Sequence, residues 1–429
     1  MEGGFNERPI LLNRRRPFQS GVASSNDRLK DFQQWGIMEV VRRQDMEIST
    51  TRKILTRDFV LGFLGRFIFQ SAHHILIPTL PIYLSKLGSE ETEIGVLIGV
   101  FGISSLFFRP FIGKALLRHS EKGVMMVGTF LFALAALAYF LAKSFWPLLI
   151  VRLVQGVGFA FFTTASFTFI ASISQRAHLG QSLSYFYLAP NLSLALAPTL
   201  GIFLVNHFSF NLLFSACVCL SLGSLFMTHK LGGTKVIPLE DSSREKSSFF
   251  SREVLPPSII SSFTHVVWGA LTAFFPLYAI NCGVANPGLF FTAIAVMLIL
   301  GRAFGGRILD VYSRERVMLY FLASPIISMA LLVFSKTQSM FVLVAAIWGF
   351  GHAFLMPSLM AYALDRAGSS RRGPAIGTYT AISDVGLVLG PMIMGVVIRL
   401  TNYPIMFSCL ALISAVSFGY FYFSMREKK

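Results

Sequence analysis

Long apolar stretches alternate with short polar ones from Phe59 onward. A helix rises 1.5 Å per residue, so about 20 apolar residues cross the hydrocarbon core of a bilayer once. Counted in this way, the pattern predicts twelve transmembrane helices. Their expected ranges are 59–82, 94–112, 124–142, 146–170, 181–205, 211–229, 256–280, 288–308, 316–335, 340–363, 374–400 and 404–424. Only helices and closed barrels satisfy every backbone group in hydrocarbon, and these stretches are too long for barrel strands. The expected fold class is therefore an all-α membrane protein.

The composition supports this class. Of the 429 residues, 54% are hydrophobic and 14% are charged, and the mean hydropathy is +0.63. A soluble chain carries about 25% charged residues, so the composition excludes a soluble globular protein and a disordered one. The four cysteines have no metal-ligand spacing, and three of them lie inside apolar stretches. We therefore expect no disulfide scaffold, no metal and no cofactor.

The basic residues indicate the orientation in the membrane. The net charge is +16, yet the Lys and Arg residues lie between apolar stretches instead of clustering with aromatic residues, as a nucleic-acid surface would require. With the N-terminus inside, the cytoplasmic side holds about 29 of the 37 basic residues and the opposite side about four. We therefore expect a multi-pass monomer of the cell (inner) membrane, with both termini in the cytoplasm.

The polar segments divide the chain. Met46 offers an alternative start, a hypothesis that mass spectrometry of the natural N-terminus would test. The expected parts are a basic, disordered cytoplasmic tail (1–57), a six-helix bundle (58–230), a cytoplasmic linker (231–255), a second six-helix bundle (256–425) and a cytoplasmic C-terminus (426–429).

The two halves repeat each other at an offset of about 193 to 195 residues. The matching positions include Pro81 and Pro276, Tyr83 and Tyr278, Gly88 and Gly283, Arg109 and Arg302, Gly156 and Gly349, and Pro198 and Pro391. Because each half contains an even number of crossings, both halves begin on the same side. The repeats are therefore parallel, related by an axis along the membrane normal.

Several short motifs fall at matching places in the two halves. They are the loop segments from Gly113 through Arg118 to Lys122 and from Gly306 through Asp310 and Arg314 to Arg316, the fourth-helix motif Arg152, Gln155, Gly156 and Gly158, the pair Pro198 and Gly201, and the run Gly386, Gly390 and Pro391. On these motifs, residues 57–425 resemble the major facilitator superfamily. The first loop segment departs from the family pattern, since Leu117 stands where the second keeps Asp310.

The resemblance implies two parallel six-helix repeats that rock around a central site by alternating access. It also implies gating or structural roles for Arg109, Gly113, Arg118, Arg302, Gly306, Asp310, Arg314, Pro198, Gly390 and Pro391.

Polar side chains within the spans predict where that site lies. Arg66, Gln70, His73 and His74 form one stripe along the first helix, although the adjacent histidines cannot both point the same way. Charge inside a membrane must face protein or water, so such residues are functional candidates. The expected substrate cavity, formed by the first, fourth, seventh and tenth helices, comprises Arg66, Gln70, His73, Arg152, Gln155, His265, Trp268, Trp348 and His352.

Asp384 is the one acidic residue that lies deep in an expected span. A carboxylate there can bind and release a proton, so we expect proton coupling at Asp384, with Arg66 and Arg152 tuning it. The structural alternative is an ion pair with an Arg on a neighbouring helix. No phosphate-binding loop of the Gly-x-x-x-x-Gly-Lys-Ser/Thr type is present, and no nucleophile and base fall together, so neither ATP drive nor an enzyme is expected.

The favoured function is secondary active transport of a small molecule by proton-coupled efflux. Two alternatives stay open. The spans hold four Arg residues against one Asp, which suits uptake or exchange of an anionic metabolite. A non-transporting membrane sensor would use the same cavity.

Overall fold

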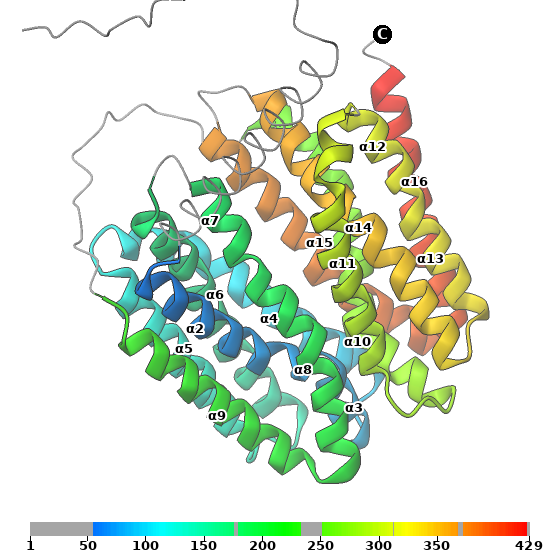
Figure 1. The fold of residues 1–429 in the computed structure, drawn as a ribbon. Coiled ribbons are helices and arrows are strands. Elements are labelled where there is room, and N and C mark those ends of the chain that lie inside the picture. The colour runs from blue at the N-terminus through cyan, green and yellow to red at the C-terminus, as the bar shows by residue number, and fades with distance from the viewer. Residues whose placement is uncertain (1–54, 176–178, 233–250, 312, 368–371, 427–429) are drawn as a thin grey trace, which may run out of the picture. The chain divides into compact units, whose positions relative to one another are not determined.

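The computed structural model describes residues 55–175, 179–232, 251–311, 313–367 and 372–426, and the regular structure within them is helical (Figure 1). The helices are α2 (Arg57–His74), α3 (Leu76–Lys86), α4 (Glu91–Leu116), α5 (Glu121–Ala138), α6 (Phe145–Ile173), α7 (Leu179–Phe186), α8 (Leu188–His207), α9 (Phe210–His229), η2 (Arg252–Val254), α10 (Leu255–Asn281), α11 (Gly288–Val311), α12 (Arg314–Phe321), α13 (Ala323–Phe334), α14 (Gln338–Ala367), α15 (Arg372–Leu400) and α16 (Tyr403–Arg426).

The all-α membrane fold expected from the sequence is confirmed. Within the described residues, eleven helices are long and apolar enough to cross a membrane, and a shorter apolar helix, Gly288–Ala303 within α11, supplies the twelfth crossing. The expected tail falls outside the described residues except for 55–57. Most of the expected linker, residues 233–250, does so as well, so these two parts of the domain organisation stay predictions.

Three of the twelve crossings are broken into two helices, and each break has a proline to explain it. Pro78, Pro190 and Pro325 lie four residues after the last residue of α2, α7 and α12, respectively. A proline has no N–H to donate to the carbonyl four residues before it, and its ring clashes with that carbonyl. The first helix therefore ends four residues before the proline, and the second helix begins after one intervening residue.

The internal repeat is visible in the backbone. Gly88 and Gly283, which match in the repeat, have φ values of 84° and 79° and are the described glycines with positive φ. Each lies just after a helix end, where this left-handed conformation favours glycine. Matching hydrogen bonds accompany them, because the Tyr83 hydroxyl lies 3.5 Å from the Ala142 carbonyl and the Tyr278 hydroxyl 2.7 Å from the Ser335 carbonyl.

Close helix crossings repeat as well. A Cβ atom placed on Gly156 of α6 would overlap the carbonyl of Phe101 in α4, and one placed on Gly349 of α14 would lie 2.7 Å from the carbonyl of Ile294 in α11. Small residues let helix backbones approach this closely in membranes. The two halves thus have a glycine at the repeat-related position of the equivalent helix crossing.

Two helix pairs join the halves, α4 with α15 and α8 with α11, and α10 also packs on α3 and α4. The two pairs are related by the repeat. A Cβ atom on Gly95 would overlap the carbonyl of Pro391, and one on Gly288 would lie 2.8 Å from the carbonyl of Pro198. These two prolines, expected to have structural roles, both lie where the halves meet.

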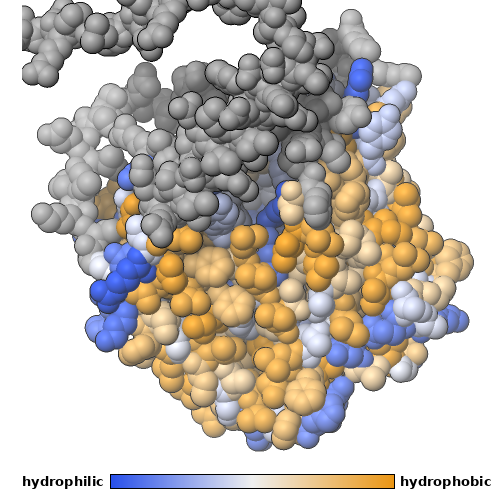
Figure 2. Space-filling model, in the orientation of Figure 1, coloured by the Kyte–Doolittle hydropathy of each residue, from blue (hydrophilic) through white to orange (hydrophobic). Residues whose placement is uncertain are grey.

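Exposed side chains on the outer helices are apolar. Phe130 on α5, Phe226 on α9, Phe334 on α13 and Phe423 on α16 are more than half exposed. Figure 2 shows a largely hydrophobic surface on the face in view. A soluble protein rarely exposes so much contiguous apolar surface, whereas a bilayer covers it.

Candidate functional site

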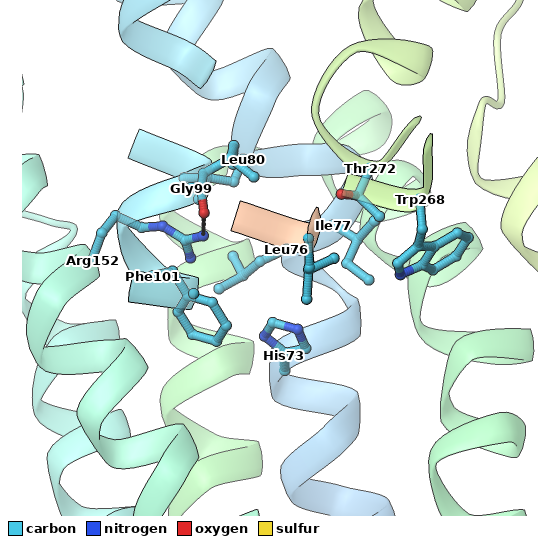
Figure 3. A pocket seen from close by; sticks show the side chains of 12 residues that line it. His73, Leu76, Ile77, Leu80, Gly99, Phe101, Arg152, Trp268 and Thr272 are labelled. Carbon is cyan, nitrogen blue, oxygen red and sulfur yellow. Dashed lines mark hydrogen bonds between the residues drawn. The ribbon is translucent and has the colours of Figure 1, made fainter. Parts of the chain in front are cut away.

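A cavity of about 110 Å³ lies between the two halves (Figure 3). Arg152 and Phe101 lie on one side of it, Trp268 and Thr272 on the other, and His73 at one end. Its lining residues are His73, Leu76, Ile77, Leu80, Ile98, Gly99, Phe101, Gly102, Arg152, Trp268, Thr272 and Leu387. The first half contributes α2, α3, α4 and α6, and the second half contributes α10 and α15.

Arg152 is held against the backbone of α4. Gly156, one turn further along α6, allows this close approach. The Arg152 Nε donates to the carbonyl of Leu97 at 2.9 Å, and a terminal nitrogen lies 3.4 Å from the carbonyl of Ile98. The other terminal nitrogen donates to the Gln155 Oε1 at 2.7 Å, which also accepts from the Tyr139 hydroxyl at 2.8 Å. The guanidinium is therefore buried and fixed by neutral acceptors alone.

His73 and Arg152 share one aromatic ring. The imidazole of His73 stacks on Phe101 with centroids 5.0 Å apart and an interplanar angle of 14°. The guanidinium carbon of Arg152 lies 4.5 Å from the centroid of the same ring, within cation–π distance. Phe159 packs against both His73 and Phe101. The His73 Nδ1 has no hydrogen-bond partner within the described structure.

Arg66 and Gln70, expected in the cavity, do not line it. Arg66 turns towards α6 and α7, where it donates to the Ser166 hydroxyl at 2.6 Å and lies over the rings of Phe167 and Phe186. Gln70 is buried, and its Oε1 has no partner in the described part of the chain. The Nδ1 of His74 lies 2.9 Å from the Ser193 hydroxyl of α8, so the two adjacent histidines do face different neighbours.

The three cavity candidates of the second half other than Trp268 lie outside this lining. The His265 Nδ1 donates to the Ser261 carbonyl at 2.8 Å, which leaves its Nε2 as an acceptor. His352 stacks on Trp348 with centroids 5.6 Å apart, and neither the His352 Nδ1 nor the Trp348 Nε1 has a partner among the described atoms. His352 is close enough to His265 to interact with it electrostatically.

Asp384 forms an ion pair with Arg109, which joins α15 to α4 and so joins the two halves. The Asp384 side chain is 19% exposed and that of Arg109 is 36% exposed. Arg66 and Arg152, expected to tune the proton at Asp384, make contacts with other residues, and their role in coupling stays a prediction.

Three of the expected gating or structural residues lie towards the end of the bundle where α2 begins and α16 ends. Gly113 and Arg118 are exposed at the end of α4, and Arg302 is exposed on α11. The side chains of Gly306, Asp310 and Arg314 lie outside the described structure, so their roles stay predictions. A Cβ atom on Gly390 would overlap the Val266 carbonyl of α10, which indicates a packing role.

Sequence reasoning missed Phe101, Phe159, Tyr139 and Thr272. The two phenylalanines could not be singled out because the chain holds 43 Phe residues. In the sequence, a Phe that packs against site residues cannot be distinguished from one that only fills the core. Tyr139 gave no signal either, because its expected span, 124–142, contains no charged residue and no histidine. Thr272 lies seven residues after His265 on α10, so a helical-spacing search from that histidine would have found it.

Twelve apolar helices in two similar halves, with a polar cavity between them, define a multi-pass membrane transport protein. The model of the Major Facilitator Superfamily matches residues 62–335 and 283–429. The chain belongs to this superfamily, and it is a transporter rather than an enzyme.

The relatives and structural neighbours agree with this assignment. The chain is 24% identical over 366 residues to the staphylopine export protein of Staphylococcus aureus strain Mu50, covering 81% of this chain and 91% of that protein. It is 23% identical over 357 residues to the quinolone resistance protein NorA of Staphylococcus aureus strain COL, covering 79% and 88%.

Two solved structures share the fold. The nucleoside transporter NupG matches with a TM-score of 0.72 and 15% identity, covering 85% of this chain and 98% of that one. The human organic anion transporter MFSD10 matches with a TM-score of 0.64 and 15% identity, covering 86% and 99%.

Proposed function

We propose that this protein is a secondary active transporter of the cell (inner) membrane that exports a small molecule in exchange for protons. Its two halves rock around the cavity of His73, Arg152 and Trp268, and both termini lie in the cytoplasm. The observation that carries the proposal is the ion pair between Arg109 and Asp384, which links the halves through a residue that can bind a proton.

Protonation of Asp384 in its ion pair with Arg109 can be coupled to movement of the two halves. When Asp384 is ionised, its charge holds Arg109 and keeps α15 against α4. When Asp384 is protonated, the charge–charge attraction is lost and the contact weakens. One proton therefore changes the relative stability of the two arrangements of the halves, which is what coupling requires.

Other titratable groups lie along the same side of the second half. His265 interacts electrostatically with Asp384, and His352 interacts with both His265 and Arg302.

Contacts at the opposite end support alternating access. The hydroxyls of Thr199 in α8 and Thr292 in α11 lie 2.9 Å apart, and Thr292 also donates to the carbonyl of Ala195 at 2.6 Å. The amide of Asn206 donates to the Ala285 carbonyl at 2.9 Å. These neutral contacts hold that end together in this conformation, and rocking would have to break them. Export, rather than uptake, is supported by the relatives, one of which is an export protein and another a resistance protein.

A substrate-free measurement tests the coupling. Spin labels on cysteines replacing Leu117 and Ile376, in a variant whose four natural cysteines are changed to Ala, report the separation of α4 and α15 near the termini. We expect the longer separation to gain population as the pH falls, and Asp384→Asn to show it at every pH. Glu90→Gln, which removes the exposed ion pair with Arg399 at the other end, is the matched control and should keep the pH response. A full pH response in Asp384→Asn would refute the assignment of the proton to this residue.

A further inference from the structure

The wall of the cavity carries a positive charge without a counter-ion. Arg152 is 5% exposed, and every hydrogen bond that it makes goes to a neutral oxygen. Among the described residues, no carboxylate lies within 4.0 Å of its guanidinium, and the protein contacts use three of its five N–H groups. A buried charge that lacks an anion is costly, so an anion brought by a ligand would be strongly favoured.

A second polar group lies beside this charge. His73 lines the cavity, its buried Nδ1 has no described partner, and the stack on Phe101 and Phe159 fixes its ring. Because Phe101 contacts both Arg152 and His73, one ring links the polar group on one side of the cavity to the polar group at its end.

The opposite wall is apolar and flat. Trp268 and Thr272 of α10 lie across the cavity from Arg152, and Leu76 and Ile77 lie between them (Figure 3). Trp268 is half-buried and packs edge-on against Phe291, so part of its ring surface is available to the cavity. An aromatic face and one hydroxyl suit a planar apolar body.

A cation would find no partner here. Among the described residues, no acidic one lines the cavity, and Asp384, the acidic residue deep in a span, is already paired with Arg109 outside it. A cavity of about 110 Å³ is somewhat smaller than a 150 Å³ cavity that holds benzene, so one ring is the upper limit on the size of a ligand in this conformation.

We infer that the substrate is a compact organic anion with a carboxylate on a planar apolar body, its carboxylate at Arg152 and His73 and its body against Trp268. This inference rests on the proposed function, since it takes the cavity as the transport site. Because Arg152 belongs to the first half and Trp268 to the second, such a ligand contacts both halves at once. Its affinity would therefore depend on the relative position of the halves, and its binding would favour one arrangement of the halves over the other.

Three probes of one skeleton test the charge preference on the unaltered protein. Phenylacetate, phenylacetamide and phenethylamine differ mainly in carrying a negative, neutral or positive group, and their binding to the purified protein in lipid nanodiscs is measured by thermal shift and tryptophan fluorescence. We expect phenylacetate to bind about tenfold more tightly than the amide, the usual gain from charge-assisted hydrogen bonds, and the amine to bind more weakly still. Equal binding of the three, or tighter binding of the amine, would overturn the inference.

Variants then locate the preference. Arg152→Gln should remove the advantage of phenylacetate over the amide, and Arg152→Lys should keep part of it. Arg399→Gln, an exposed arginine at the far end of α15, is the matched control and should keep it all. If Arg152→Gln fails to fold, Arg152→Lys and His73→Asn take its place, and His73→Asn must still reduce the advantage of phenylacetate over the amide. Retention of the full advantage in every variant of Arg152 and His73 that folds would place the anion elsewhere.

The outcome is separable from that of the proposed function. The binding measurement uses no proton gradient, and the spin-label measurement uses no substrate. A pH response with no anion preference would refute only the substrate class, and an anion preference with no pH response would refute only the proton coupling.

Discussion

Arg109 of α4 and Asp384 of α15 form an ion pair at one of two symmetry-related interfaces between the halves, and the described residues of the other interface hold no equivalent. By the repeat offset, Arg302 corresponds to Arg109 and Asn191 to Asp384. Asn191 of α8 carries no charge, and its Nδ2 has no partner within the described structure. One sequence difference thus leaves α8 without a counterpart of the carboxylate that pairs with Arg109 at the α4–α15 interface.

A double-mutant cycle should show that this pair is energetically coupled. We expect Arg109→Ala and Asp384→Ala to have an interaction energy of about 1 to 2 kcal/mol in thermal unfolding, because both side chains are partly shielded from solvent. The pair of Glu90 and Arg399 has its charged atoms 2.8 Å apart, yet both side chains are more than half exposed. For it we expect only a few tenths of a kcal/mol. Equal coupling in the two cycles would contradict the role given to the first pair.

Installing an acid at the symmetric position should restrain the second interface. Asn191→Asp places a carboxylate where the repeat would pair it with Arg302, and Asn191→Leu removes the polar group without adding charge. We expect Asn191→Asp to raise the melting temperature at neutral pH and to slow transport, because a new ion pair favours one arrangement of the halves. A melting temperature that is no higher than that of Asn191→Leu would show that the pair does not form.

Glycines on α15 should differ sharply in their tolerance of a methyl group. A Cβ atom on Gly390 would overlap the Val266 carbonyl, whereas one on Gly377 of the same helix meets nothing within 4 Å. We expect Gly390→Ala to cost about 1 to 3 kcal/mol of stability, since the backbones of α10 and α15 must separate. Gly377→Ala should gain up to about 1 kcal/mol from helix propensity. Thermal unfolding of the two variants in the same detergent gives the comparison, and similar losses would mean that α10 and α15 do not approach this closely.

The sequence predicted the helices well because the length and hydropathy of a crossing are set by the bilayer. The expected span 211–229 is observed as Phe210–His229, and the repeat-related glycines at 88 and 283 have the same conformation. The breaks within crossings were not predicted. Pro78 ends a helix, but Pro276 lies inside the continuous α10. The difference depends on how neighbouring helices accommodate the freed carbonyl, which one helix's sequence does not contain.

The candidate site was predictable only by residue type. The polar stripe of the first helix predicted that Arg66, Gln70 and His73 line the same cavity, but of these three only His73 does so. The break at Ile75 and the packing of α2 against α6 and α8 decide which way each side chain points. Likewise, four intramembrane arginines were possible partners for Asp384. The choice of Arg109 follows from the packing of α4 on α15, which a single sequence does not show.

The two repeat-related tyrosines should contribute unequally to stability. The Tyr278 hydroxyl is 2.7 Å from the Ser335 carbonyl and lies in a buried side chain, whereas the Tyr83 hydroxyl is 3.5 Å from the Ala142 carbonyl. We expect Tyr278→Phe to cost about 1 kcal/mol, because it removes a well-formed buried hydrogen bond. Tyr83→Phe should cost at most a few tenths, since a bond of that length is weak. Thermal unfolding measures both changes, and a larger loss of stability in Tyr83→Phe than in Tyr278→Phe would contradict this prediction.

Cysteine labelling in intact cells should decide the orientation on which the direction of transport depends. Lys143 lies between α5 and α6 and His119 between α4 and α5, so the two exposed positions fall at opposite ends of the bundle. The excess of basic residues on the side of the termini predicts that His119 lies in the cytoplasm and Lys143 outside. In a variant without natural cysteines, a membrane-impermeant maleimide should therefore label Lys143→Cys on intact cells and label His119→Cys only after the cells are opened. The reverse pattern would place the termini outside and the Arg109–Asp384 pair on the external side. Protons driven inward would then reach that pair before they reach the cavity, and export coupled to Asp384 would need a different order of steps.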